Sequence, residues 1–151
     1  MSLRFHYKLV PTGYSVLTLG GRFVRPRPIV PMTVIGPAGQ YSLRAFLDPG
    51  SDETVFQEGV AAAIGVDLTN APLGRASGIG LVGSILRYTN VSVQITDGKE
   101  LRLWNAWVGF TTTRLIYPIL GFAGFLQFFD ARFFGAREQV ELEVKSLFPG
   151  T

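Results

Sequence analysis

Asp48 is the residue whose type and surroundings best suit it for chemistry. It follows the apolar pair at residues 46–47, it precedes a Pro-Gly turn at 49–50, and a second apolar run begins at Val55. Aspartate is common in turns because its side chain bonds nearby backbone groups, but such turns rarely lie this close to apolar runs on both sides. The pattern predicts one carboxylate presented at the tip of a tight loop between buried strands.

The composition leaves few other routes to catalysis. The chain has no cysteine, which excludes disulfides, a thiolate nucleophile and Cys-ligated metals. Its one histidine is His6, so a multi-histidine zinc site is excluded and a Ser-His-Asp triad would have to use that residue. Carboxylate chemistry, a lysine or hydroxyl mechanism, or no chemistry remains. We expect no metal site and no cofactor.

Positive charge is concentrated in the first third of the chain. The net charge is +3, residues 1–47 contain no acidic residue, and all eleven acids lie at or beyond Asp48. This asymmetry could favour nucleic acid or an anionic surface. A solvated strand face is the favoured interpretation, because the charges cluster only between residues 22 and 27. A nucleic-acid binder using Arg22, Arg25, Arg27 and Phe23 is kept as a minor alternative.

No segment is expected to enter a membrane. The first residues lack the apolar core of a signal peptide. The strongest apolar stretch, residues 115–129, is too short to span a bilayer and is interrupted by Pro118, Gly121 and Gly124. We therefore expect this stretch in the core of a soluble, cytoplasmic protein with neither membrane nor nucleic acid as a partner.

The length suits one domain. Glycine and proline recur at short intervals between stretches of β-branched and aromatic residues, which is typical of an all-β sandwich or barrel. The predicted strands are residues 5–10, 14–19, 29–35, 41–47, 85–95, 101–108, 117–120, 129–134 and 139–144. Turns are predicted at 36–39, 97–98 and 135–137, and short helices at 57–64 and 122–128.

Two further segments accompany the Asp48 loop. Residues 77–83 place three glycines between apolar residues, which predicts a mobile hairpin tip that could close over a substrate. An ordinary glycine-rich turn is the alternative, and no βαβ context supports a phosphate loop. Residues 118–121 read Pro-Ile-Leu-Gly, a short apolar strand ending in a glycine.

The three segments, in this order, resemble the retropepsin-like aspartic protease family, in a bacterial-type single-domain form. The resemblance covers residues 40–145. It implies an all-β retropepsin-like acid-protease barrel with one or two short helices and an N-terminal β extension. We therefore divide the chain into an extension, residues 1–35, and a retropepsin-like domain, residues 36–151. In the family the glycine corresponding to Gly121 lets a loop thread beneath the catalytic aspartate.

The resemblance also implies a mechanism. Aspartic catalysis needs two carboxylates that share a proton around one water, and this chain has one such loop. A twofold-related copy would supply the second Asp48, so an aspartic endopeptidase acting as a homodimer on a peptide or protein is predicted. The implied catalytic residues are Asp48, Gly50 and Ser51. The implied substrate-binding residues are Asp52, Gly78, Ile79, Gly80 and Leu81.

Two residues depart from the family. Pro49 stands where a Thr or Ser helps to hold the two active-site loops together, and proline has neither the hydroxyl nor the N–H. Phe122 stands where retroviral members have an arginine paired to the acid that corresponds to Asp52, a role that Arg132 or Arg137 could take. These departures support a second hypothesis, a catalytically weak or inactive module of the same fold that binds a peptide or partner chain.

Overall fold

The computed structural model describes residues 1–76 and 83–151, which form mainly β-strands around a closed barrel. Six of the described strands follow the order β4-β5-β10-β6-β9-β8, and pairing of β4 with β8 closes the ring. These strands are β4 (Ile29–Gly36), β5 (Gly39–Leu47), β6 (Val55–Gln57), β8 (Ile85–Thr96), β9 (Leu101–Thr111) and β10 (Ile119–Leu120). The short strand β7 (Leu73–Arg75) pairs with β8 outside the ring. The predicted all-β barrel is confirmed.

The barrel hairpins follow from local sequence. Val91, Val93 and Ile95 of β8 are buried, while the residues between them are partly exposed, so the alternation gives one wet and one dry face. The predicted turns at 36–39 and 97–98 join β4 to β5 and β8 to β9 as antiparallel hairpins. Register is therefore set both by the turns and by the buried face.

Strand β10 is the barrel strand that lies beside Asp48. It runs parallel to β5, with Leu120 beside Leu47, and antiparallel to β6, with Ile119 beside Val55. It is far from both strands in sequence, yet it separates them. The β5–β6 connection, which contains Asp48, is thus held at its base by a segment from the other end of the chain.

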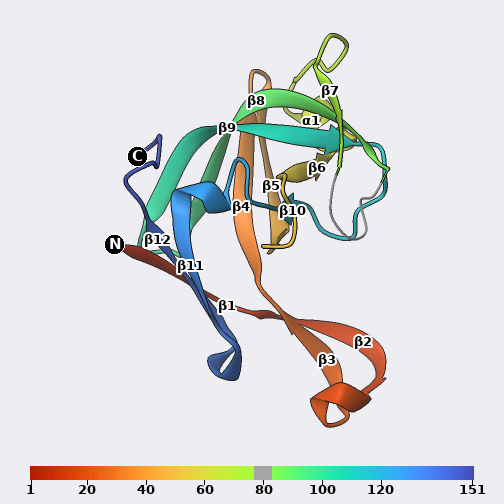
Figure 1. Ribbon diagram of the computed structural model, residues 1–151, viewed down its shortest axis with the longest axis vertical. Helices are drawn as coiled ribbons and strands as arrows, with labels where there is room; N and C mark the ends of the chain where they lie inside the picture. The colour runs from red at the N-terminus through yellow and green to blue at the C-terminus, as the bar shows by residue number, and fades with distance from the viewer. Residues whose placement is uncertain (77–82) are drawn as a thin grey trace.

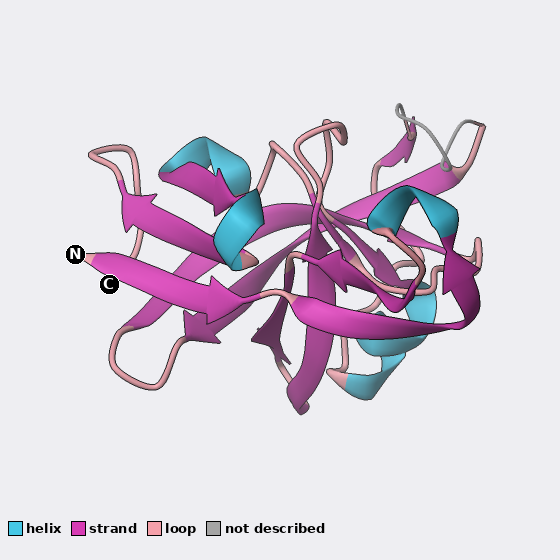
Figure 2. Ribbon diagram, turned by 90° about the horizontal axis from the view of Figure 1, so that it is seen from below, coloured by secondary structure: helices cyan, strands magenta, loops and turns pink. Residues whose placement is uncertain are grey.

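Two smaller sheets lie outside the barrel. β1 (Ser2–His6), β12 (Gln139–Val144) and β11 (Phe129–Phe134) form one sheet in that order, and β2 (Lys8–Val16) with β3 (Arg22–Arg27) forms a two-stranded ribbon. Figure 1 shows the ribbon extending away from the barrel, and Figure 2 shows strands as the dominant element. The helices are α1 (Glu58–Ala63) and the 3-10 turns η1 (Leu17–Leu19), η2 (Leu126–Phe128) and η3 (Gly135–Arg137).

Three predicted elements differ in kind or in strand partner from the observed ones, and the strand predicted at 117–120 is shortened to β10. The strand at 5–10 is two strands, because the chain leaves β12 after His6 and pairs with β3 from Lys8. The strand at 14–19 ends at Val16 and turns into η1. The helix at 122–128 is only η2, because Gly124 has a φ of +88° that breaks helical geometry. The helix at 57–64 is confirmed as α1.

One core joins the barrel to the β1-β12-β11 sheet. Leu3 and Leu142 of that sheet belong to the same buried cluster as the barrel residues. Trp104 on β9 packs with Phe125, Phe129 and Phe148, with ring centroids 5.4 to 5.6 Å apart.

The division of the chain into residues 1–35 and 36–151 stays a prediction. Within the described ranges, no helix is long and apolar enough to cross a membrane.

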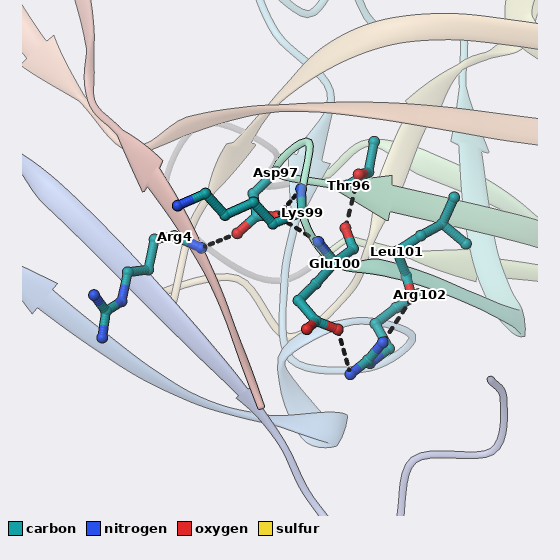
Figure 3. Close-up of polar contacts among 7 residues, drawn as sticks. All are labelled: Arg4, Thr96, Asp97, Lys99, Glu100, Leu101 and Arg102. Carbon is teal, nitrogen blue, oxygen red and sulfur yellow. Dashed lines mark hydrogen bonds and ion pairs between the residues drawn. The ribbon is translucent and has the colours of Figure 1, made fainter.

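The β8–β9 turn is tied to β1 through the carboxylate of Asp97 (Figure 3). Its Oδ1 accepts hydrogen bonds from the backbone N–H groups of Lys99 and Glu100, at 2.9 and 2.8 Å, and its Oδ2 accepts one from Arg4 N at 3.0 Å. Burial alone would raise the pKa of Asp97, but these backbone hydrogen bonds outweigh it and hold the pKa below its usual range.

We expect Asp97→Ala to lower the free energy of unfolding at pH 7 by about 1 kcal/mol, allowing for solvent screening of a partly exposed group. Because the folded pKa is depressed, this stabilisation is present above the unfolded value of about 3.9 and is lost as pH falls through the folded pKa. Urea unfolding of both proteins at several pH values measures it. A difference that persists undiminished at the acid end would contradict the assignment.

Candidate active site

Asp48 occupies the first position of a tight turn directly after β5. Asp48 N donates to Leu120 O at 3.0 Å, and Ser51 N donates to Asp48 O at 3.1 Å, which closes a four-residue turn. Pro49 stands at the second position, where its fixed φ suits such turns, and the φ of Gly50 is not positive, as in type I. Proline is therefore accommodated in the loop of the single chain.

The carboxylate of Asp48 is oriented by its own loop. Gly50 N donates a hydrogen bond of 2.9 Å to Asp48 Oδ1, and a Cβ added at Gly50 would lie 3.2 Å from that oxygen. Asp48 itself is partly buried. Among the described residues no donor is recorded for Oδ2, which leaves this oxygen available to water or to a reacting group. Gly50 thus orients the Asp48 carboxylate, and the catalytic roles expected of both residues stay a prediction.

Ser51 serves the loop itself. Its side chain is buried, its hydroxyl donates to Glu53 O at 2.8 Å, and its Oγ accepts from Glu53 N at 3.4 Å. Ser51 O in turn accepts the N–H of Phe122 at 2.9 Å. The structure therefore places Ser51 as a residue that positions the Asp48 turn rather than one whose hydroxyl faces solvent.

Asp52 and Glu53 continue the loop toward β6. Asp52 is exposed, and its carbonyl oxygen accepts the N–H of Ala123 at 2.9 Å. Glu53 Oε1 accepts a hydrogen bond from the hydroxyl of Tyr88 at 3.2 Å. Burial, and then the nearby Glu53 carboxylate, raises the pKa of Tyr88. Sequence reasoning missed Tyr88, because nothing local to β8 marks a tyrosine that contacts a distant loop.

Gly121 lets the chain pass directly beneath the Asp48 loop. A Cβ at this position would lie 2.2 Å from Glu53 O and 2.6 Å from Ser51 O, distances that no side chain can adopt. The predicted close approach of Gly121 is confirmed. Phe122 follows it and is 59% exposed, so an apolar residue lies at the surface beside the loop.

The two arginines considered as partners of Asp52 have contacts elsewhere. Arg132 pairs with Glu141 at 4.0 Å and with Glu143 at 3.7 Å. Arg137 stacks on the ring of Phe134 at 4.1 Å. Both guanidinium groups therefore contact residues of the β11–β12 hairpin.

The predicted flap lies largely outside the described residues. Residues 77–82 are not described, and this range includes Gly78, Ile79, Gly80 and Leu81. The strands on either side pair antiparallel, with Arg75 beside Ile85, and Ala76 N donates to Ser84 O at 2.9 Å. Within the described parts of the chain, no group of three or more His, Cys, Asp or Glu side chains is placed to hold a metal ion.

Thr54 carries the buried side-chain oxygen that lacks a hydrogen-bond partner in the described structure. We expect Thr54→Val to raise the free energy of unfolding by about 1 kcal/mol, because valine has the same shape without the unsatisfied hydroxyl. Thr111→Val is the matched control. Thr111 is equally buried, but its Oγ1 accepts the N–H of Thr113 at 3.1 Å, so this variant should lose stability. Thermal unfolding of the three proteins would test the opposite signs.

Comparison with known proteins supports the fold. No family model matches the chain, and no curated protein matches it. A solved structure described as a retropepsin-like aspartic protease from Rickettsia conorii superposes with a TM-score of 0.56, covering 94% of this chain and 91% of that chain, at 17% sequence identity. At this sequence identity, the superposition shows similarity of fold alone. The barrel, with the Asp48 turn between β5 and β6, is thus a retropepsin-like fold.

Proposed function

We propose that the protein is an aspartic endopeptidase that acts as a homodimer. The observation that carries the proposal is the Asp48 carboxylate on a closed turn, oriented by Gly50 N and supported from below by Leu120 and Gly121. The retropepsin-like fold of the chain agrees with it. A second copy related by a twofold axis contributes its own Asp48, so that each site contains two carboxylates.

The two carboxylates divide the chemistry between them. One, ionised, acts as general base and takes a proton from a water. The other, protonated, donates a hydrogen bond to the carbonyl oxygen of the scissile peptide bond. The water oxygen attacks the carbonyl carbon, and the C–N bond then breaks as the nitrogen gains a proton. No cofactor takes part in the proposed reaction.

The substrate that we propose is an extended peptide or protein segment. The exposed ring of Phe122 beside the active-site loop offers an apolar contact, either to the substrate or to the second subunit. We propose Asp52 and residues 78–81 as further substrate contacts. We also propose a cytoplasmic location, with neither nucleic acid nor membrane as a partner.

The second candidate is a peptide-binding or partner-binding module without activity. Pro49 favours it, because this residue offers no N–H and no hydroxyl to a facing loop. The proline is exposed at the tip of the turn, where a second subunit would approach. A protein of this kind would bind peptides but leave them intact.

A cleavage assay over a dilution series separates the two candidates. Purified protein is incubated with a mixture of peptides and a denatured protein, and the products are identified by mass spectrometry. The endopeptidase predicts discrete internal cuts, with a specific activity that falls on dilution as dimers dissociate. Substrates that stay intact at every protein concentration would overturn the endopeptidase. A specific activity that does not change on dilution would overturn a site shared by two subunits.

We expect Pro49→Thr to tighten the dimer by about 2 kcal/mol, or roughly thirtyfold in Kd. Threonine restores an N–H and a hydroxyl at the proposed axis, each worth about 1 kcal/mol and present twice. The loss of proline's rigidity costs about 0.4–1 kcal/mol in each chain. Sedimentation of both proteins across a dilution series measures the change. Pro11→Thr, in the exposed ribbon, is the control and should leave the dimer Kd unchanged. A Pro49→Thr dimer weaker than wild type would mean that the Asp48 loop does not lie at the twofold axis.

A further inference from the structure

A cavity of about 510 Å³ lies between the β2–β3 ribbon, the η3 turn and β5. Three of its lining residues are arginines of the ribbon, Arg22, Arg25 and Arg27, and its wall on the barrel side includes Phe46. Figure 1 shows the ribbon and the β11–β12 hairpin extending in the same direction from the barrel. The cavity is therefore formed where the ribbon meets the barrel.

The cavity carries an excess of positive charge. Its lining has three arginines and one carboxylate, Glu138. Glu138 Oε1 is already paired to Arg22 Nη1 at 2.6 Å. Neither Arg25 nor Arg27 has an ion-pair partner among the described residues, in contrast to Arg22. Arg25 and Arg27, both partly buried, thus line the cavity without a paired anion.

The guanidinium groups are backed by apolar and partly desolvated surface. The Arg27 guanidinium lies 5.8 Å from the centre of the Phe46 ring, in a cation–π contact. Tyr7 also lines the cavity, and burial raises the pKa of its hydroxyl. A carboxylate entering this space would meet planar donors that are suited to bidentate hydrogen bonds.

The cavity borders the end of β5 that leads to Asp48. Phe46 lines the cavity and lies two residues before Asp48. Phe46 N and Asp48 N donate to Pro118 O and Leu120 O at 2.8 and 3.0 Å, so the backbone stays extended to Asp48. In extended backbone, side chains two apart point to the same side, about 6.7 Å from each other. The β3–β4 junction runs beside this end of β5, since Leu47 N donates to Pro28 O at 2.9 Å and Phe46 pairs with Ile29. An extended peptide whose scissile bond lies at Asp48 repeats its side chains at the same spacing.

We infer that this cavity is a subsite that selects an acidic side chain, glutamate or aspartate, one or two residues from the scissile bond. Arg25 and Arg27 bind the carboxylate, and Phe46 contacts the aliphatic part of the side chain. Arg22 is held by Glu138 and forms the far wall. The inference rests on the proposed peptidase function and names the substrate class of the same site.

The test separates binding from cleavage. Asp48→Asn protein is titrated with fluorescent apolar octapeptides that carry Glu at one position at a time, each beside its Gln counterpart. We expect one position at which Glu binds about tenfold or more tightly than Gln. The preference should disappear in the Arg25→Gln/Arg27→Gln variant, weaken with added salt, and persist in Lys99→Gln, which removes a cation from the β8–β9 turn outside the cavity.

The possible outcomes assign failure to one hypothesis or the other. If the preference is found and depends on the arginines, but wild-type protein cuts none of the peptides, the subsite stands and the peptidase function fails. If peptides are cut with no arginine-dependent preference for Glu, the peptidase stands and the subsite is overturned. The subsite is also overturned if no octapeptide binds, or if a single-stranded oligonucleotide of equal charge binds the arginines more tightly than the Glu peptide.

Discussion

Asp48→Asn is expected to abolish peptide cleavage, with a fall on the order of 10³-fold or more, and to leave the fold intact. Asparagine keeps an oxygen that can accept the hydrogen bond from Gly50 N, which spans 2.9 Å in the structure, so the turn should survive. It cannot act as a base or hold the shared proton. Circular dichroism and thermal unfolding establish the fold, and initial rates on a cleaved peptide establish the loss.

Mixing the two proteins tests whether each site uses two copies of Asp48. If subunits pair at random, an approximately ninefold excess of Asp48→Asn protein should leave about a tenth of the wild-type activity, because most wild-type subunits then lie in mixed dimers. Asp67→Asn protein, altered at an exposed carboxylate that accepts hydrogen bonds from Thr69, should give no such loss at the same excess. Activity that is unaffected by the excess would show that one chain suffices.

Activity should be highest below neutral pH. In the proposed dimer, two facing carboxylates could not both be ionised without mutual repulsion, so an active pair would retain one proton. As pH rises and that proton leaves, the general acid is lost and the rate falls. The titration belongs to the pair and not to either residue. A rate that climbs through neutral pH would contradict the two-carboxylate mechanism.

Gly121→Ala is expected to cost about 3 kcal/mol of unfolding free energy and to lower activity together with stability. Its Cβ would lie 2.2 Å from Glu53 O and 2.6 Å from Ser51 O, both backbone atoms, so no side-chain rotation relieves the clash. The Asp48 loop would have to move. Denaturant unfolding measures the loss of stability.

Gly59→Ala is the matched control for this substitution. Gly59 lies in α1, and a Cβ there would meet nothing within 4 Å. Alanine is the better helix former by about 0.5–1 kcal/mol, so this variant should be more stable than wild type. A Gly121→Ala protein as stable as wild type would mean that the loop yields easily, and the support of Asp48 from below would then be unimportant.

The sequence by itself determined the features that depend on neighbouring residues. Alternation of apolar and polar side chains predicted strands such as β8 and β12, because a strand sends successive side chains to opposite faces. The Asp-Pro-Gly turn after an apolar run predicted where Asp48 would lie, because proline and glycine restrict the backbone locally. The likeness in fold to a retropepsin-like protease agrees with the family that these segments suggested.

The tertiary structure decided what depends on contacts between distant segments. The insertion of β10 between β5 and β6, the bond from Tyr88 to Glu53 and the arginine-lined cavity all join residues far apart in the chain. The tertiary structure also divides the predicted strand at 5–10 into two strands, because β1 pairs with β12 whereas β2 pairs with β3. Local sequence patterns do not predict such pairings. Bringing distant segments together costs conformational entropy, and only the packing between those segments offsets that cost.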